Sequence, residues 1–194
     1  FGYKVSLSSN GNIVAIGGPN NDGNGSYSGH VRIYENNGGT WIQVGQDIDG
    51  ATAGELSGCA IDLNNSGNII AIGAKSNSTS GTHCGQVRIF ENISGVWTII
   101  GQAINGESPY DESGYSVSLS SNGNIVSIGA IFNNGNGSNS GHVRTYENIA
   151  GSWTQIGQDI DGEFSNDQSG RSLSLSGSGS IVAVGGPFNQ VNGN

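Results

Sequence analysis

"SLSSNGNIVAIGGP", residues 6–19, is the stretch that decides the fold. It reads as two short strands on either side of Asn10-Gly11. Asn-Gly between strand-like runs is the strongest short hairpin signal, because a type I′ turn needs positive φ at both central residues. A near copy, "SLSSNGNIVSIGA", occupies residues 118–130. The hairpin therefore belongs to a unit that recurs along the chain.

The repeat has a period of 56 residues without gaps. Four sets of residues share this spacing: Tyr3, Cys59, Tyr115 and Arg171; Gly2, Gly58, Gly114 and Gly170; Trp41, Trp97 and Trp153; and Arg32, Arg88 and Arg144. Periods of this order are typical of solenoids and propellers. They predict one segment, 1–194, made of units 1–56, 57–112, 113–168 and an incomplete 169–194.

Each unit contains four strand-like runs separated by turn signals, which in the first unit are residues 3–8, 12–17, 29–35 and 40–45. No stretch has the 3.6-residue apolar period of a helix. The second run is apolar at successive positions, so both of its faces need cover, which a lone sheet cannot supply. We predict an all-β propeller of four-stranded antiparallel blades, about three and a half of them here. Further blades would come from the same parent chain or from a second copy.

Composition limits the partners. The chain has six Lys and Arg against fifteen Asp and Glu, a net charge of −9. Such a balance repels nucleic acid and anionic membrane surfaces. The sequence lacks any run of the ~20 apolar residues that a membrane span needs. We therefore expect protein or glycan partners, with no nucleic acid and no membrane insertion.

Phe1-Gly2, followed by "VSLSSNGNIVAIGGP" ending at Pro19, resembles the FG-GAP repeat. This repeat is the blade unit of integrin α-subunit-like propellers and of many secreted or surface proteins. The resemblance implies a propeller outside the cytosol that serves in adhesion. Members often carry a calcium loop of the D-x-D-x-D-G type in the first hairpin. Here that place holds "SSNG" or "NSG" without a carboxylate, so we transfer no metal site and expect no cofactor.

The long loops 18–29, 74–85 and 130–141 and the connectors 47–58, 103–114 and 159–170 are expected on one face of the propeller. Binding residues tend to lie on loops that a rigid scaffold holds. The predicted ligand-binding residues are Tyr27, Tyr110, Phe132 and Phe164 as aromatic contacts, and Asn24, Asn136, Asp111 and Asp167 as polar ones. The alternative is that these segments are only solvated connectors.

Two acidic pairs, Asp47 with Asp49 and Asp159 with Asp161, flank Ile48 and Ile160. We interpret them as turn residues around buried isoleucine anchors. A calcium site and acid–base catalysis remain alternatives.

The arginine set in the third strand-like run is interpreted as an inter-blade hydrogen-bonding device. Its expected partners are backbone carbonyls or the repeated Glu35, Glu91 and Glu147. No arrangement of Ser, His and Asp suggests a nucleophile, so no catalytic residue is predicted.

Cys59 and Cys84 both depart from the repeat, and both lie in the second unit. This paired exception favours a disulfide over two buried thiols, which would place the protein outside the cytosol. Five N-x-S/T sequons begin at Asn24, Asn64, Asn77, Asn92 and Asn136. Asn24, Asn77 and Asn136 are the expected glycan acceptors, because they fall in the long loops.

The sequence as a whole predicts a non-enzymatic, extracellular or cell-surface interaction module that binds protein or glycan. Two alternatives are a structural component of an extracellular filament, sheath or surface layer, and a secreted lectin. An enzyme is the third reading, which no convergent catalytic cluster supports.

Overall fold

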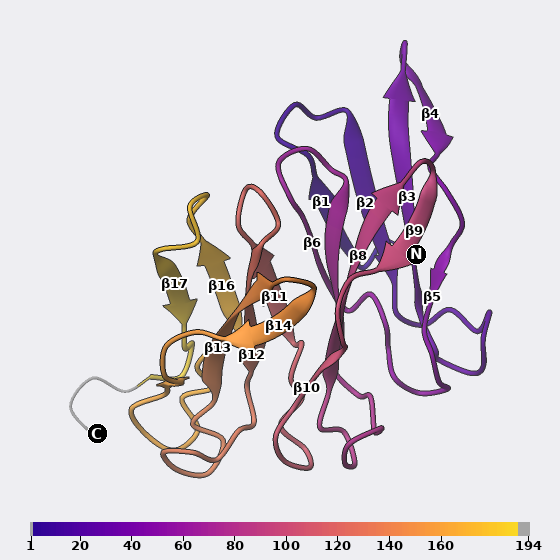
Figure 1. Ribbon diagram of the computed structural model, residues 1–194. Helices are drawn as coiled ribbons and strands as arrows, with labels where there is room; N and C mark the ends of the chain where they lie inside the picture. The colour runs from indigo at the N-terminus through magenta and orange to yellow at the C-terminus, as the bar shows by residue number, and fades with distance from the viewer. Residues whose placement is uncertain (1, 190–194) are drawn as a thin grey trace.

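The regular structure of the protein consists of strands. A computed structural model describes residues 2–189, and all of the named elements in that range are β-strands (Figure 1). Phe1 of the FG motif lies outside the described residues. Within residues 2–189 there is no helix with the length and apolar character needed to cross a membrane.

Three units have five strands each, and a fourth has two. The first contains β1 (Lys4–Leu7), β2 (Ile13–Gly18), β3 (His30–Asn37), β4 (Thr40–Gln43) and β5 (Ile48–Asp49). The second contains β6 (Ala60–Leu63), β7 (Ile69–Ala74), β8 (Gln86–Ile93), β9 (Val96–Ile99) and β10 (Ile104–Asn105). The third contains β11 (Ser116–Leu119), β12 (Ile125–Ala130), β13 (His142–Ile149), β14 (Ser152–Gln155) and β15 (Ile160–Asp161). The last pair is β16 (Ser172–Leu175) and β17 (Val182–Gly185).

All strand pairs are antiparallel, and the first sheet has the order β1-β2-β3-β4. β4 pairs with residues 34–37 of β3, whereas β5 pairs with His30 and Val31 at its start. The fourth strand position is thus filled by two segments. Sequence reasoning predicted the first four strands, and it took the acidic segment at 47–49 for a turn instead of a strand.

The hairpin turn differs from the predicted type I′. The β1–β2 ladder ends at Leu7 opposite Val14, and residues 8–12 form the loop between the two strands. Within this loop only Gly11 has positive φ, 72°. The Gly11 amide donates to the Ser8 carbonyl at 2.9 Å, and the Asn12 amide donates to Asn10 Oδ1 at 2.9 Å. Asn10 therefore stabilises the loop through its side chain, and Gly11 alone supplies the left-handed residue.

Successive sheets pack against one another through their first strands, because β1 contacts β6, β6 contacts β11, and β11 contacts β16. Figure 1 shows the sheets side by side in chain order, from indigo to yellow. The protein is thus an all-β assembly of antiparallel four-stranded sheets, compatible with a propeller-like fold.

The apolar core lies between the sheets. One cluster joins residues of the first two sheets, including Ala15, Val31, Leu63 and Ile72, and another cluster joins the second sheet to the third. Every residue of β7 is buried, whereas β2 is only half buried. The prediction that the second strand needs cover on both faces is confirmed for β7, which has a sheet on each side.

Hydrogen bonds also link the sheets. The carboxylate of Asp62 on β6 accepts from the Ser6 hydroxyl at 3.1 Å, and from the Ser118 hydroxyl at 3.3 Å and the Leu119 amide at 2.8 Å. The Trp97 indole donates to the Val44 carbonyl at 2.9 Å. The second sheet is therefore joined to both of its neighbours by polar as well as apolar contacts.

Candidate functional site

The polar residues of the predicted recognition face hold the loops together. Asn24 Nδ2 donates to the Gly50 carbonyl at 2.8 Å, and Asn136 Nδ2 donates to the Gly162 carbonyl at 2.9 Å. Asp111 and Asp167 are each 1% exposed. Their Oδ2 atoms accept from connector amides, those of Ser108 at 3.0 Å and Phe164 at 2.8 Å, and from the side chains of Asn133 and Asn189. These four residues tie each connector to a neighbouring loop.

Three of the four predicted aromatic contacts are exposed to solvent. Tyr27, Tyr110 and Phe164 are exposed, while Phe132 is half-buried. Tyr110 stacks on His83 with ring centroids 6.1 Å apart. Ligand binding by this face remains a prediction, but its polar half is already engaged within the protein.

One predicted glycan acceptor is buried. Asn77 is 1% exposed, and its Nδ2 donates to Glu55 Oε2 at 2.7 Å. The expectation that it lies in an accessible loop is wrong, because its side chain is part of a buried loop contact. Asn24 and Asn136 are exposed, although their Nδ2 atoms also donate to carbonyls.

The predicted disulfide is also wrong, since Cys59 and Cys84 are buried free thiols. Cys59 Sγ faces the carbonyls of Gly73 and Gly114, at 3.4 and 3.7 Å. Cys84 Sγ faces the carbonyl of Asn77 at 3.6 Å, in a separate loop environment. Burial raises the pKa of Cys59 to about 11. The extracellular location stays a prediction, without support from a disulfide.

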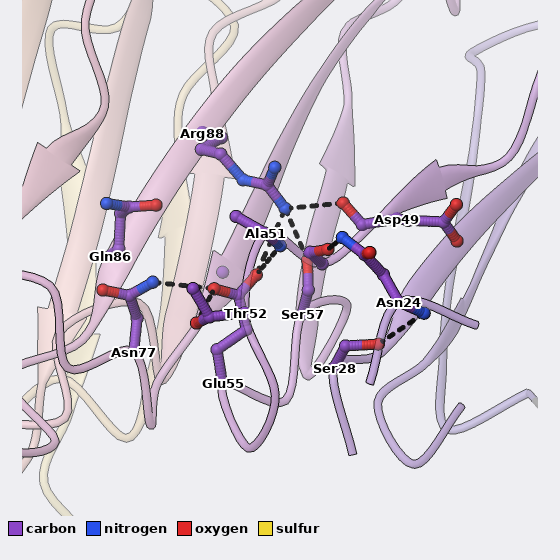
Figure 2. Close-up of polar contacts among 12 residues, drawn as sticks. Asn24, Ser28, Asp49, Ala51, Thr52, Glu55, Ser57, Asn77, Gln86 and Arg88 are labelled. Atoms are coloured by element: carbon purple, nitrogen blue, oxygen red, sulfur yellow. Dashed lines mark hydrogen bonds and ion pairs between the residues drawn. The ribbon is translucent and has the colours of Figure 1, made fainter. Parts of the chain in front are cut away.

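Two of the three repeated arginines, Arg88 and Arg144, link neighbouring units as the sequence predicted, whereas Arg32 pairs with Asp47 of its own unit. Arg88 on β8 donates to the Asp49 carbonyl at 3.0 Å and to Ser57 Oγ at 3.1 Å, and it pairs with Glu55 at 3.4 Å (Figure 2). Asp49 and Glu55 belong to the preceding unit, and Ser57 is the first residue of the unit that contains Arg88. Burial lowers the pKa of Arg88, and the charge of Glu55 opposes this.

Arg144 on β13 makes the corresponding link between the second and third units. It pairs with Glu107 of the preceding connector and with Asp159 at 2.7 Å. These hydrogen bonds outweigh the effect of burial and raise the pKa of Arg144. One expected kind of partner is found, because Arg88 donates to the backbone carbonyl of Asp49. The acidic partner of Arg88 is Glu55, and those of Arg144 are Glu107 and Asp159. All three lie in the connectors, so the expected partners Glu91 and Glu147 are not the ones found.

The register of the short strands places histidine beside the acidic pairs. His142 lies opposite Asp161 in the β13–β15 ladder. Its Nδ1 is 3.6 Å from Asp159 and 3.9 Å from Asp161. Burial and the charge of Arg144 lower its pKa, so the imidazole is neutral at neutral pH. Hydrogen bonds from Arg144 lower the pKa of Asp159.

The two isoleucines that were predicted as buried anchors differ in their exposure to solvent. Ile48 is 4% exposed, as predicted, but Ile160 is 40% exposed. Ile48 packs in the cluster that includes residues of the complete second sheet. The sheet that follows Ile160 has only two strands among residues 2–189, so less apolar surface covers it.

A pocket of about 210 Å³ lies where the first strands of all four units meet. We call it the axial pocket. Its lining includes the four equivalent residues at the strand starts together with Lys4 and Lys75; these are Tyr3, Lys4, Cys59, Lys75, Tyr115 and Arg171. The 56-residue spacing of the strand starts explains the convergence, since adjacent first strands bring equivalent positions together.

The axial pocket concentrates positive charge. Three of the six Lys and Arg residues of the chain line it, namely Lys4, Lys75 and Arg171. The other three lie on the third strands of their units, and each forms an ion pair with a carboxylate; they are Arg32, Arg88 and Arg144. Within residues 2–189 no ion pair involves Lys4 or Arg171. In a protein of net charge −9, this is the surface suited to an anion.

The ring of Tyr115 makes cation–π contacts with two of these residues. Lys75 Nζ lies 5.2 Å, and the Arg171 guanidinium 5.6 Å, from the centroid of its ring. Lys75 also pairs with Glu112 at 2.9 Å, a hydrogen bond that outweighs burial and raises the pKa of Lys75. Cation–π contacts restrain the long side chains at the pocket. The pocket thus holds fixed positive groups beside one carboxylate–ammonium pair.

A second pocket, of about 320 Å³, lies between the connector of the second unit and the third sheet. We call it the carboxylate pocket. It is lined by Glu107, Ser108, Asp111, Asn133, Asn134, Gly135, Asp159 and Asp161. Four carboxylates face one guanidinium here, that of Arg144. This pocket repels anions.

Sequence reasoning identified the equivalent strand starts without assigning them a site. The available signal was the location of Lys4, Lys75 and Arg171, which all flank the first hairpins of their units. In a propeller these hairpins include the strand nearest the axis, so cations there converge.

Comparison with known proteins shows the fold. No family model matches the sequence, and no curated protein matches it. Two solved structures resemble the chain, both named as "putative 6-phosphogluconolactonase". The one from Bacteroides fragilis has 17% identity and a TM-score of 0.55, over 81% of this chain and 38% of the other. The one from Bacteroides uniformis has 18% identity and a TM-score of 0.54, over 81% and 39%. The chain thus spans less than half the length of either.

These neighbours overturn the expected function. The prediction of a non-enzymatic adhesion or interaction module, with its filament and lectin alternatives, is wrong because the solved structures of similar fold carry the name of a hydrolase. The absence of a catalytic signal in the sequence led to that prediction. The cationic residues of the axial pocket are too far apart in the chain to form a recognisable motif.

Proposed function

We propose that the chain forms part of a propeller-like hydrolase that opens an anionic sugar lactone bound at the axial pocket. The observation that carries the proposal is the convergence of Lys4, Lys75 and Arg171 on that pocket in an otherwise acidic protein. The names of the two structures with a similar fold support a phosphorylated lactone as the substrate class.

The pocket residues suit two tasks. The guanidinium of Arg171, free of ion pairs among residues 2–189, matches the geometry of a phosphate group and donates two parallel hydrogen bonds to it. Lys4 adds a second positive charge at the same pocket. The ammonium of Lys75 and the phenol of Tyr115 are donors for the oxyanion that forms when water adds to the lactone carbonyl.

Glu112 is the base in this proposal, because its carboxylate is held 2.9 Å from the ammonium of Lys75, which lines the pocket. Water attacks the carbonyl carbon while Glu112 takes its proton. The ring C–O bond then breaks, and the proton passes from Glu112 to the leaving ring oxygen. The product is the open-chain hydroxy acid, so no further reactant is required.

The experiment is a turnover assay on 6-phosphogluconolactone and on the unphosphorylated gluconolactone, with acid release as the readout. Arg171→Gln should raise KM for the phosphorylated lactone by about ten- to a hundredfold, the worth of a charged hydrogen-bonded pair. Glu112→Gln should lower kcat and leave KM nearly unchanged. Arg32→Gln is the matched control, because it removes an equal charge outside the pocket. Hydrolysis no faster than the uncatalysed rate, or equal effects of R171Q and R32Q, would overturn the proposal.

We also propose that the units repeat every 56 residues as blades of a larger propeller, with the FG-GAP repeat as the related blade type. Inter-sheet bonds at constant spacing support this proposal. Ser6 with Asp62 and Asp62 with Ser118 are each 56 residues apart, and the two indole-to-carbonyl bonds of Trp97 and Trp153 each span 53 residues. The length of the two similar structures supports a ring with further blades.

A further inference from the structure

We propose that the carboxylate pocket is a divalent-cation site, with calcium as the preferred ion. This site is distinct from the axial pocket and from the first hairpins, and it does not depend on the proposed hydrolase activity. The key ligands are Asp111 and Asp161, with the side-chain oxygen of Asn133 between connector and loop.

A buried, unpartnered oxygen points to a missing ligand. Asp111 is 1% exposed, and its Oδ2 is satisfied by Ser108 and Asn133. Its Oδ1 is buried and has no hydrogen-bond partner, although the residue lines the pocket. A buried carboxylate oxygen without a partner costs free energy, and a bound cation would satisfy it.

The net negative charge of the pocket also favours a bound cation. Glu107 and Asp159 share the guanidinium of Arg144. Four lining carboxylates against one guanidinium leave three negative charges in one pocket. Hard cations such as Ca²⁺ prefer several carboxylate and amide oxygens of this kind.

The opening of the pocket is kept clear by a glycine. A β-carbon on Gly135 would come within 3.0 Å of Asp161 Oδ1 and 3.1 Å of Asn133 Oδ1. These two oxygens therefore lie close together beside a residue without a side chain, which leaves room for an ion or its water.

The equivalent place in the second unit keeps the asparagine, Asn77 for Asn133, but lacks the surplus of carboxylates, the glycine and the unpartnered oxygen. Ala51, Asn105 and Thr79 replace Glu107, Asp161 and Gly135 at the 56-residue spacing. Glu55 replaces Asp111, and its two oxygens accept from the Ala51 amide, the Thr52 hydroxyl and Asn77 and pair with Arg88 (Figure 2). There the arginine fills the position, and no carboxylate oxygen is left over. The contrast within one chain assigns the cation to the pocket at Asp111.

Calcium titration of the purified chain by calorimetry, together with thermal unfolding, tests the proposal. We expect saturable binding and a calcium-dependent rise in Tm for the wild type. Asp161→Asn should weaken binding by at least about tenfold, because one charged ligand is lost. Asn fits this strand position, as Asn105 shows, so the variant should fold.

Asp49→Asn is the matched control. It removes the same charge from the equivalent position of β5, outside the lining of the carboxylate pocket, and it should bind calcium like the wild type. Gly135→Thr, which copies Thr79, should also weaken binding by blocking the opening. Absence of saturable binding by the wild type, or equal losses in D161N and D49N, would overturn the proposal.

Discussion

At the scale of single residues, one repeated position carries different chemistry in successive units. Asp62 occupies the place of Ser6 and Ser118, and it accepts hydrogen bonds from both of these hydroxyls and from the Leu119 amide. The hydroxyls in turn accept from backbone amides, those of Leu63 and Leu175. Asp62 is thus the centre of a polar network that crosses three sheets.

Removal of this centre should destabilise the protein. Asp62→Ala leaves one amide and two hydroxyls without an acceptor, and we expect a loss of about 2–4 kcal/mol in the free energy of unfolding. Asp62→Asn keeps one acceptor oxygen and should cost much less. Denaturant unfolding of the three proteins measures both differences. Equal stabilities of D62A and D62N would contradict this role.

The same residue predicts a pH dependence. Burial raises the pKa of Asp62 above its ordinary value of 3.8, so the folded protein holds this proton more tightly than the unfolded chain does. The contribution to stability is therefore full below about pH 4 and declines as pH rises through the folded pKa. The stability of the wild type relative to D62N should fall as the pH rises above about 4. A difference that rises over this range would contradict the assignment.

The free thiols give a second residue-scale prediction. Both cysteines are buried, and burial raises the pKa of Cys59 to about 11. Thiol reagents at mildly alkaline pH should modify neither cysteine in the folded protein and both in denaturant, because the thiolate is the reactive form. Recovery of a disulfide-linked peptide by mass mapping would show that the thiols are paired.

Sequence reasoning singled out several loop residues, but it could not show how their side chains are already engaged. Asp111 and Asn136 were predicted as ligand contacts, and their side chains also hold connectors to loops. Spacing along the chain cannot show which oxygen of a carboxylate is already occupied. It also cannot show that Lys4 and Arg171 meet at one pocket, because that depends on the packing of the sheets.

At the scale of elements, the sequence predicted the strands well where a turn signal bounded an apolar run. β2, β3 and β4 follow the predicted runs within a few residues. β5 was missed because a two-residue strand has no periodicity of its own and forms only by pairing with His30 and Val31. The burial of β7 and the partial exposure of β2 reflect their neighbours rather than their similar sequences.

The outer strands provide a direct test of sheet packing. Trp97 is 4% exposed and donates to the Val44 carbonyl of the preceding unit, whereas Trp41 is 46% exposed. Trp97→Phe should lower the free energy of unfolding by about 1 kcal/mol or more, because the carbonyl loses its donor. Trp41→Phe should change it by less than about 0.5 kcal/mol. A loss in W41F as large as that in W97F would show that the indole bond between sheets is not the cause.

At the scale of the whole molecule, the repeat predicted stacked sheets, and the exposed ends show what the stack requires. Leu63 and Leu119 are each 6% exposed, but the equivalent Leu7 is 58% exposed on the first sheet. Val5 on the same strand is 64% exposed. Neighbouring sheets alone account for this difference, since the residue types are similar.

We therefore expect the 194-residue chain to associate with a second copy of itself when it is produced alone. Leu7→Lys should weaken that association, because it places a charge on the apolar face. Analytical ultracentrifugation over a range of concentrations measures the effect. A wild type that stays monomeric throughout would contradict the expectation.

The proposed function depends on the same stacking, because it places residues from four units around the axial pocket. The most direct test is calorimetric titration of the wild type, R171Q and R32Q with 6-phosphogluconate, the product of the proposed reaction. We expect saturable binding by the wild type and R32Q, and affinity lower by about ten- to a hundredfold in R171Q. Binding that is unchanged in R171Q, or that is lost equally in R32Q, would contradict it.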